Sequence, residues 1–165
     1  MRENKGQISA EFLFLAGVII LVMMISVVFI AEEQELNIAM SAARNGANEG
    51  AVSTSSAIYP EDAYRDYSQS QSDLSFPYSV EIVNISYSQM GSDENYDKEK
   101  IQFKVYAKNS KDFSEAELDA IGERINYNLR KALAISFNST ASTNGLYNPV
   151  FSPHYVYTTA NVKWV

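Results

Sequence analysis

The apolar stretch from Phe12 to Ala31 constrains this chain more than any other feature of its sequence. It contains no charged residue and no proline. At a rise of 1.5 Å per residue, a helix of this length spans roughly 30 Å, the thickness of a bilayer core. A secretory signal has a shorter apolar region, of about 7–15 residues, followed by small residues at a cleavage site. We therefore predict a membrane-spanning helix over residues 12–31 rather than an ordinary signal peptide.

The charges on either side of this stretch predict its orientation. Arg2 and Lys5 precede it. Three acids follow it, at Glu32, Glu33 and Glu35. Basic residues favour the cytoplasmic side of a membrane. We expect a cytoplasmic N-terminus and an extracytoplasmic C-terminal part.

Glu11 stands immediately before the apolar stretch, where a carboxylate is costly unless it has a partner. One interpretation is local: an acid at a helix N-terminus is favoured by the macrodipole and can reach the headgroups. The other is functional, because acids within membrane segments usually mark functional sites. We favour the functional interpretation for Glu11.

The residues around Glu11 run Lys5-Gly6-Gln7-Ile8-Ser9-Ala10-Glu11-Phe12. This segment resembles the class III signal peptide of archaeal type IV pilin-like proteins in its basic leader, its glycine, its glutamate and the apolar run that follows. The resemblance implies that a prepilin peptidase cuts between Gly6 and Gln7. Residues 1–6 would be a cleaved leader, and Glu11 would become the fifth residue of the mature chain. In that family the glutamate is thought to pair with the new N-terminal amine of a neighbouring subunit.

The helix is expected to continue beyond the membrane span. Leu36, Met40, Ala43 and Ala47 recur at helical spacing. We predict one helix from about Gln7 to about Asn48, with Gly46 and Gly50 marking its end. In domain terms, residues 7–50 form an N-terminal helix and residues 51–77 form a linker or irregular segment.

Residues 78–165 predict one extracytoplasmic α+β head with an antiparallel sheet of about three or more strands and a second helix. The expected order is a strand over 78–87 with an irregularity between Ile82 and Val83, a polar loop over 91–97, a strand over 101–107, a helix over 114–136, a loop over 138–153 and a strand over 155–165. Ser114 and Glu117 have the spacing of a capping box at the start of the second helix.

Composition excludes several functional classes. The chain has no cysteine, which excludes disulfides, thiol catalysis and cysteine-based metal sites. Its net charge of −7 argues against nucleic-acid binding. The head is long enough for one small domain with a modest core. Its stability must therefore come from packing, glycans or neighbouring subunits.

Two N-glycosylation sequons lie in the expected head. Asn84-Ile85-Ser86 falls within a predicted strand, and Asn138-Ser139-Thr140 falls in a predicted loop. The pattern is short and arises often by chance. Since glycans attach at accessible surfaces, Asn138 is the better candidate of the two acceptors, Asn84 and Asn138.

No motif in the head predicts catalysis, a metal or another cofactor. Asp93-x-Asn95-x-Asp97 resembles the opening of a calcium loop, but Lys98 stands where glycine is needed and Lys104 stands where glutamate is needed. A solvated charged turn is the better interpretation. His154 is the only histidine and has no evident catalytic partner. We do not predict an enzyme.

The resulting hypothesis is a structural subunit, a pilin or minor pilin, of an archaeal type IV pilus-like surface filament. Its expected partners are copies of itself or related pilins, a prepilin peptidase, and the membrane through residues 12–31. It would leave the membrane for an extracellular filament after processing. The alternative is a single-pass, membrane-anchored binding module that does not polymerise and needs neither cleavage nor Glu11.

Overall fold

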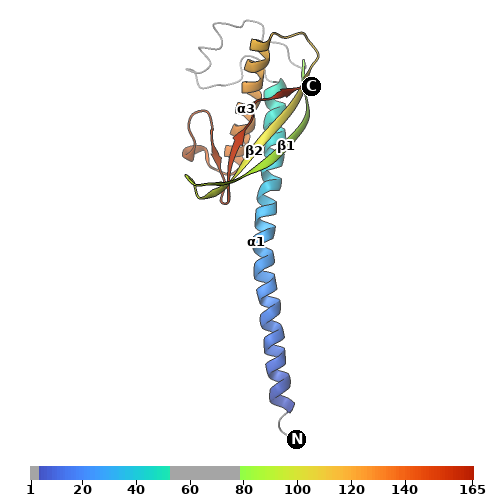
Figure 1. The fold of residues 1–165 in the computed structure, drawn as a ribbon, viewed down its shortest axis with the longest axis vertical. Coiled ribbons are helices and arrows are strands. Elements are labelled where there is room, and N and C mark those ends of the chain that lie inside the picture. The colour runs from blue at the N-terminus through green and yellow to red at the C-terminus, as the bar shows by residue number, and fades with distance from the viewer. Residues whose placement is uncertain (1–3, 53–78) are drawn as a thin grey trace. The chain divides into compact units, whose positions relative to one another are not determined.

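The computed structural model describes residues 4–52 and 79–165, and Figure 1 shows their fold. The chain divides into two compact units, Met1–Asn37 and Ile38–Val165. The described part of the first unit is helical and belongs to α1 (Asn4–Val52). The predicted linker lies outside the described residues, apart from residues 51 and 52, which end α1.

The second unit contains the C-terminal part of α1, a five-stranded sheet and a further long helix, so the predicted α+β class is confirmed. After α1 its elements follow in the order β1 (Val80–Asp93), β2 (Lys98–Asn109), α3 (Glu115–Ser136), the 3-10 turn η1 (Thr140–Ser142), β3 (Val150–Phe151), β4 (Tyr155–Thr159) and β5 (Lys163–Trp164). The predicted hairpin, second helix and C-terminal strand tract are all present.

The sheet is mixed, which corrects the expectation of an antiparallel sheet. Its strand order is β1-β2-β4-β3, and β5 also pairs with β2. β1 is antiparallel to β2, whereas β4 and β5 are both parallel to β2. The physical reason is the connection between β2 and β4. It contains α3, which is long enough to return the chain to the end of the sheet at which β2 begins, as parallel pairing requires.

The two hairpin strands follow the periodicity of their residues. Alternate side chains of β2 are buried, at Ile101, Phe103, Val105 and Ala107. The register with β1 shifts between Ile82 and Asn84, which confirms the predicted irregularity. The polar loop is shorter than predicted, because β1 continues to Asp93 before the turn.

The predicted C-terminal strand over 155–165 is interrupted. Both of its pieces, β4 and β5, pair with β2. Between them the Ala160 N–H donates to the Phe103 carbonyl oxygen at 2.9 Å. The interruption lets the backbone turn toward α3, where the Asn126 side-chain amide donates to the Ala160 carbonyl oxygen at 3.0 Å.

Aromatic side chains form much of the core face of the sheet. Phe103 and Tyr157 have ring centroids 5.9 Å apart, and Tyr157 stacks on Phe137 at 5.5 Å. Tyr87 meets the edge of Phe103 at 6.2 Å. Because Phe137 caps the C-terminus of α3, this stacking places α3 on the core face.

Both ends of α3 are capped by local hydrogen bonds. Ser114 and Glu117 form the predicted capping box. At the other end, the Asn138 N–H donates to the Ile135 carbonyl oxygen and the Ser139 N–H donates to the Ala134 carbonyl oxygen, the pattern of a Schellman motif. Asn138 holds the left-handed conformation that this motif requires, with φ of 50°.

The C-terminal part of α1 packs closely on α3, and Figure 1 shows the two helices side by side. Contact is made through small residues, because a Cβ atom at Gly46 would lie 2.7 Å from the Leu129 Cα and one at Gly50 would lie 2.7 Å from the Ile125 Cα. The prediction that these glycines mark the end of the helix is therefore wrong, because both lie within α1. Arg124 donates from Nε to the Gly50 carbonyl oxygen at 2.9 Å, near the C-terminus of α1.

The loop after α3 is tied to the core. Arg130 donates from Nε to the Leu146 carbonyl oxygen at 3.1 Å and from Nη1 to the Thr159 hydroxyl at 2.7 Å. The rings of Tyr127 and Tyr147 lie 5.5 Å apart. Burial, followed by the neighbouring Tyr147, raises the pKa of the Tyr127 phenol.

Candidate functional site

The candidate functional site in the first unit is the apolar part of α1. Its large apolar side chains between Phe12 and Ile30 are exposed wherever they are described, over a range from 44% at Val18 to 76% at Phe14. The exposure covers the whole circumference of the helix, since successive residues point in all directions. A helix that is apolar all round requires an apolar environment outside itself.

The free energy of burying apolar side chains indicates how strong this requirement for an apolar environment is. Burying one large apolar side chain contributes roughly 1.5–3 kcal/mol. Summed over this segment, the gain is on the order of tens of kcal/mol, above the roughly 5–15 kcal/mol that stabilises an ordinary domain. α1 contains one stretch, near the N-terminus, that is long and apolar enough to cross a membrane.

The polar groups of this segment are few and specifically placed. Glu11 is exposed and directly precedes Phe12, which is 69% exposed. Gly6 and Gln7 belong to the helical backbone of α1, while their surroundings fall outside the described part. Further along, the Ser26 hydroxyl donates to the Val22 carbonyl oxygen at 2.8 Å, so this hydroxyl has an acceptor within its own helix.

The helical backbone relates the predicted processing position to Glu11. Gln7 and Glu11 are four residues apart in α1 and therefore lie on one face, about 6 Å apart along the axis. A terminal amine created at Gln7 would lie about one helical turn from Glu11 of the same chain.

The two sequons occupy different structural settings. Asn84 is exposed on β1 at the register shift and faces Tyr106 in the ladder. Asn138 is exposed at the end of α3 and also supplies the left-handed residue of the cap. Both asparagines are therefore on the surface of the head. Ser139, within the second sequon, is buried.

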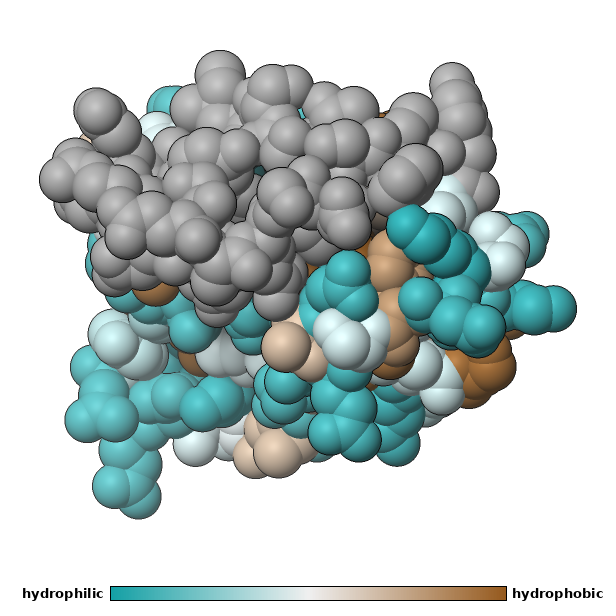
Figure 2. All heavy atoms as spheres, turned by 90° about the horizontal axis from the view of Figure 1, so that it is seen from above, coloured by the Kyte–Doolittle hydropathy of each residue, from teal (hydrophilic) through white to brown (hydrophobic). Residues whose placement is uncertain are grey.

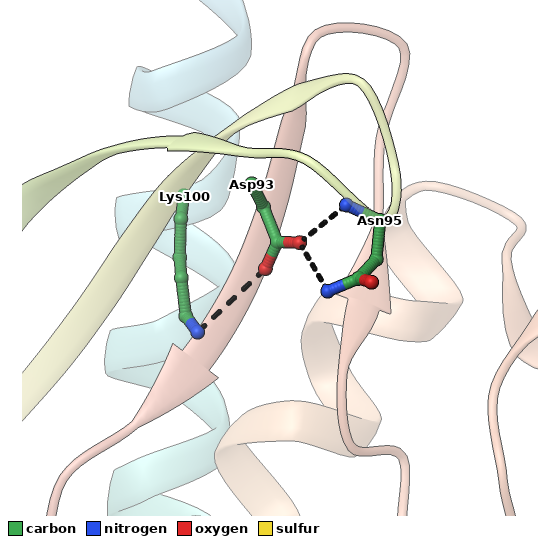
Figure 3. A network of polar contacts seen from close by, with 3 residues as sticks. All are labelled: Asp93, Asn95 and Lys100. Atoms are coloured by element: carbon green, nitrogen blue, oxygen red, sulfur yellow. Dashed lines mark hydrogen bonds and ion pairs between the residues drawn. The ribbon is translucent and has the colours of Figure 1, made fainter.

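The hairpin tip resembling a calcium loop is organised by its own side chains, as Figure 3 shows. Asp93 accepts from the Asn95 backbone N–H at 3.1 Å and from its side-chain amide at 3.2 Å. Its other oxygen lies 3.7 Å from Lys100 Nζ. Within residues 4–52 and 79–165, no group of three or more histidine, aspartate or glutamate side chains is placed to hold a metal ion.

His154 lies in the turn before β4. Its carbonyl oxygen accepts from the Glu99 N–H at 3.2 Å, and its ring lies 6.5 Å from the Tyr155 ring. Lys98 donates from Nζ to the neighbouring carbonyl oxygens of Ser152 and Pro153. These contacts hold the turn against the start of β2, a structural role for the segment.

A pocket that sequence reasoning missed lies between α3 and the C-terminal segment. It has a volume of about 220 Å³ and is lined by Leu118, Asp119, Glu123, Asn161, Val162 and Trp164. Asp119 and Glu123 are one helical turn apart and both exposed. The sequence shows the one-turn spacing of Asp119 and Glu123, but only the fold places Trp164 beside them.

Comparison with protein-family models, with curated proteins and with solved structures finds no match for this chain.

Proposed function

We propose that this chain is a structural subunit, a pilin or minor pilin, of an archaeal type IV pilus-like surface filament, processed between Gly6 and Gln7. The observation that carries the proposal is the apolar helix, which is exposed all round and begins directly after Glu11. Such a surface fits lipid before assembly and copies of the same helix afterwards.

Before processing, the chain would span the membrane once, with residues 1–6 on the cytoplasmic side and the head outside. Removal of the leader creates an ammonium group at Gln7. Within an apolar bundle, an opposite charge at short range is the least costly partner for that group. Glu11 of a neighbouring subunit supplies it, and the pair would set the register of the bundle.

Exchange of lipid for a neighbouring helix brings little hydrophobic gain, because lipid tails are as apolar as leucine. Close packing and polar contacts must then drive assembly. Gly17 supports this, since a Cβ atom there would meet nothing within 4 Å and the position leaves room for another backbone. Together with the Glu11 pair, this close approach would favour one register.

The first experiment determines the N-terminal residue of the mature chain, by mass spectrometry of material from the native envelope. We expect Gln7, with the chain in sedimenting high-molecular-weight fibres. Gly6→Leu should leave the leader attached and the chain in the membrane. An intact Met1 in wild-type material would instead support the membrane-anchored binding module.

The role of Glu11 is tested separately from cleavage. Glu11→Ala should be processed at Gln7 yet enter fibres poorly, because the new ammonium then lacks its partner. Glu33→Ala removes an exposed acid of the same helix outside the apolar stretch and serves as the matched control. Normal fibres from Glu11→Ala would contradict the assigned pairing, whatever the result for the leader.

A further inference from the structure

The second unit carries two surfaces of opposite charge on opposite sides of its sheet. We propose that the pocket formed by Asp119, Glu123 and Trp164, here called the acidic pocket, binds Lys108 of a second copy of this chain. This inference rests on the proposed function, since it assigns a contact between heads in the filament.

The acidic pocket suits a cationic side chain with an apolar stem. Asp119 and Glu123 repel each other at one-turn spacing, so a cation between them removes an unfavourable interaction. Trp164 offers an aromatic face, and Leu118 and Val162 offer apolar walls. At about 220 Å³ the pocket is below the roughly 300–1,000 Å³ of small-molecule sites, a size suited to one side chain.

The complementary surface lies on the solvent side of β2 and β5. Lys104, Lys108 and Lys163 surround Tyr106 there, and we call these three residues the lysine face. Their side of the sheet follows from the alternation of β2, whose residues Phe103 and Val105 point into the core. One exposed acid shares this face, because Glu81 pairs with Lys108 in the β1–β2 ladder, but the three lysines outnumber it in a chain of net charge −7.

Within the lysine face, Lys108 is the residue best placed to reach a partner. Lys104 donates to the Ser88 hydroxyl at 3.0 Å, and Lys163 lies over the Tyr106 ring at 5.8 Å. Lys108 is exposed. Its cross-strand neighbour is Glu81, but among the described residues the one ion pair within 4.0 Å joins Lys100 and Asp93, so Lys108 is not held by Glu81 at that distance.

One chain cannot join these surfaces by itself. α3 and the acidic pocket lie on the core side of the sheet, as the stacking of Phe137 on Tyr157 indicates, whereas Lys108 projects from the other side. Two copies can join them, each using a different surface. In such a head-to-tail contact, each copy still has one surface available for the next copy. When the rotation between copies does not close a ring, the contact generates a helical filament.

Cross-linking tests the contact directly, because the chain has no cysteine of its own. A chain carrying Asn161→Cys at the pocket and Ser110→Cys near Lys108 keeps all three charges and should form disulfide-linked ladders in native envelopes on mild oxidation. Each single variant should give at most dimers. Asn161→Cys with Lys131→Cys places the second thiol on α3 and should give no ladder. Absence of ladders from the first pair in wild-type-like fibres would overturn the contact.

Charge reversal tests the chemistry of the pocket. Lys108→Glu, and separately Asp119→Lys with Glu123→Lys, should each lower the fraction of chain in fibres about fivefold or more, since one weakened contact recurs along the filament. Combining all three changes should restore it. Glu94→Lys reverses the charge of an exposed acid at the hairpin tip in the same way, and should leave the fraction of chain in fibres unchanged.

The outcomes separate this inference from the proposed function. Wild-type chains with an intact Met1 and no fibres would refute the filament itself. Normal fibres from every reversed variant would leave the filament standing and overturn the head contact. Loss of fibres on reversal of the pocket but not of Lys108 would overturn the assignment of Lys108 and point to another cation as the occupant.

Discussion

At Gly46 the absence of a side chain decides how closely two helices approach. A Cβ atom there would lie 2.7 Å from the Leu129 Cα and 2.8 Å from the Ala132 Cβ. Backbone atoms cannot yield as the end of a flexible side chain can. Helix propensity and tertiary packing therefore act in opposite directions at this residue.

We expect Gly46→Ala to destabilise the second unit by roughly 1–3 kcal/mol, although alanine is the better helix former by about 1 kcal/mol. Urea unfolding of the full chain in detergent, followed at the head aromatics, measures the change. Gly145→Ala is the control, because its Cβ atom would meet nothing within 4 Å. A stabilised Gly46→Ala chain would contradict the close approach of α1 and α3.

The Glu117 carboxylate gives the head a predictable response to acid. It accepts from the Ser114 hydroxyl at 2.6 Å and from the Ser114 N–H at 2.7 Å, and these bonds lower the pKa of Glu117 from its ordinary value. Because the folded-state pKa is the lower one, the stabilising effect is complete above the unfolded-state pKa. It is lost as the pH falls through the folded-state pKa.

Glu117→Gln should therefore weaken the dependence of the urea midpoint on pH in the acid range, and should lower stability at neutral pH. Glu115→Gln removes an acid from the same turn without disturbing Ser114, so it should keep the acid response of the wild type. If both variants retain that response equally, the capping box is not its source.

At the scale of the elements, α3 connects most of the head. Its middle contacts the interruption between β4 and β5 through Asn126 and packs on α1 through Ile125 and Leu129, and its C-terminal cap stacks on the sheet. The cap depends on Asn138, which also belongs to a sequon. One substitution can separate these two roles.

Asn138→Gly should keep the cap, because glycine adopts positive φ without strain, while it removes the acceptor nitrogen. Asn138→Val should cost roughly 1–2 kcal/mol, as a β-branched residue does in the left-handed region. Intact mass of the exported chain shows whether Asn138→Gly loses a glycan. A mass change equal to the substitution alone would exclude use of this sequon, and Asn84→Gln is the parallel test for the other.

At the scale of the whole molecule, polar and apolar surfaces are divided between the two units. On the face shown in Figure 2, the described residues that are visible are mostly hydrophilic, with apolar residues scattered among them. In contrast, the described large apolar side chains from Phe12 to Ile30 are all exposed. The first unit therefore needs lipid or other helices, whereas the second has a core of its own.

A chain that begins at Ile38 should accordingly fold and remain in solution without detergent, since it is a compact unit by itself. The full chain should partition into membranes. A chain that begins at Ser79 is the control: it lacks the α1 residues that pack on α3 and should unfold at much lower urea. Aggregation of the longer piece would show that its core is incomplete.

The sequence by itself determined the features that depend on local periodicity and local hydrogen bonding. The apolar stretch from Phe12, the alternation of Ile101 to Ala107, the irregularity after Ile82 and the Ser114–Glu117 box were all predictable, because each is encoded by residues close together in the chain. The roles assigned to Gly6 and Glu11 are also read from neighbouring residues and stay predictions.

Only the tertiary structure decided the features that depend on distant segments. The parallel pairing of β2 with β4 follows from the crossover through α3, and the interruption near Ala160 follows from its bond to Asn126. Gly46 looked like a helix end because its partners on α3 are far away in sequence. Trp164 joined Asp119 in a pocket for the same reason: burial selects among long-range contacts that local pattern leaves open.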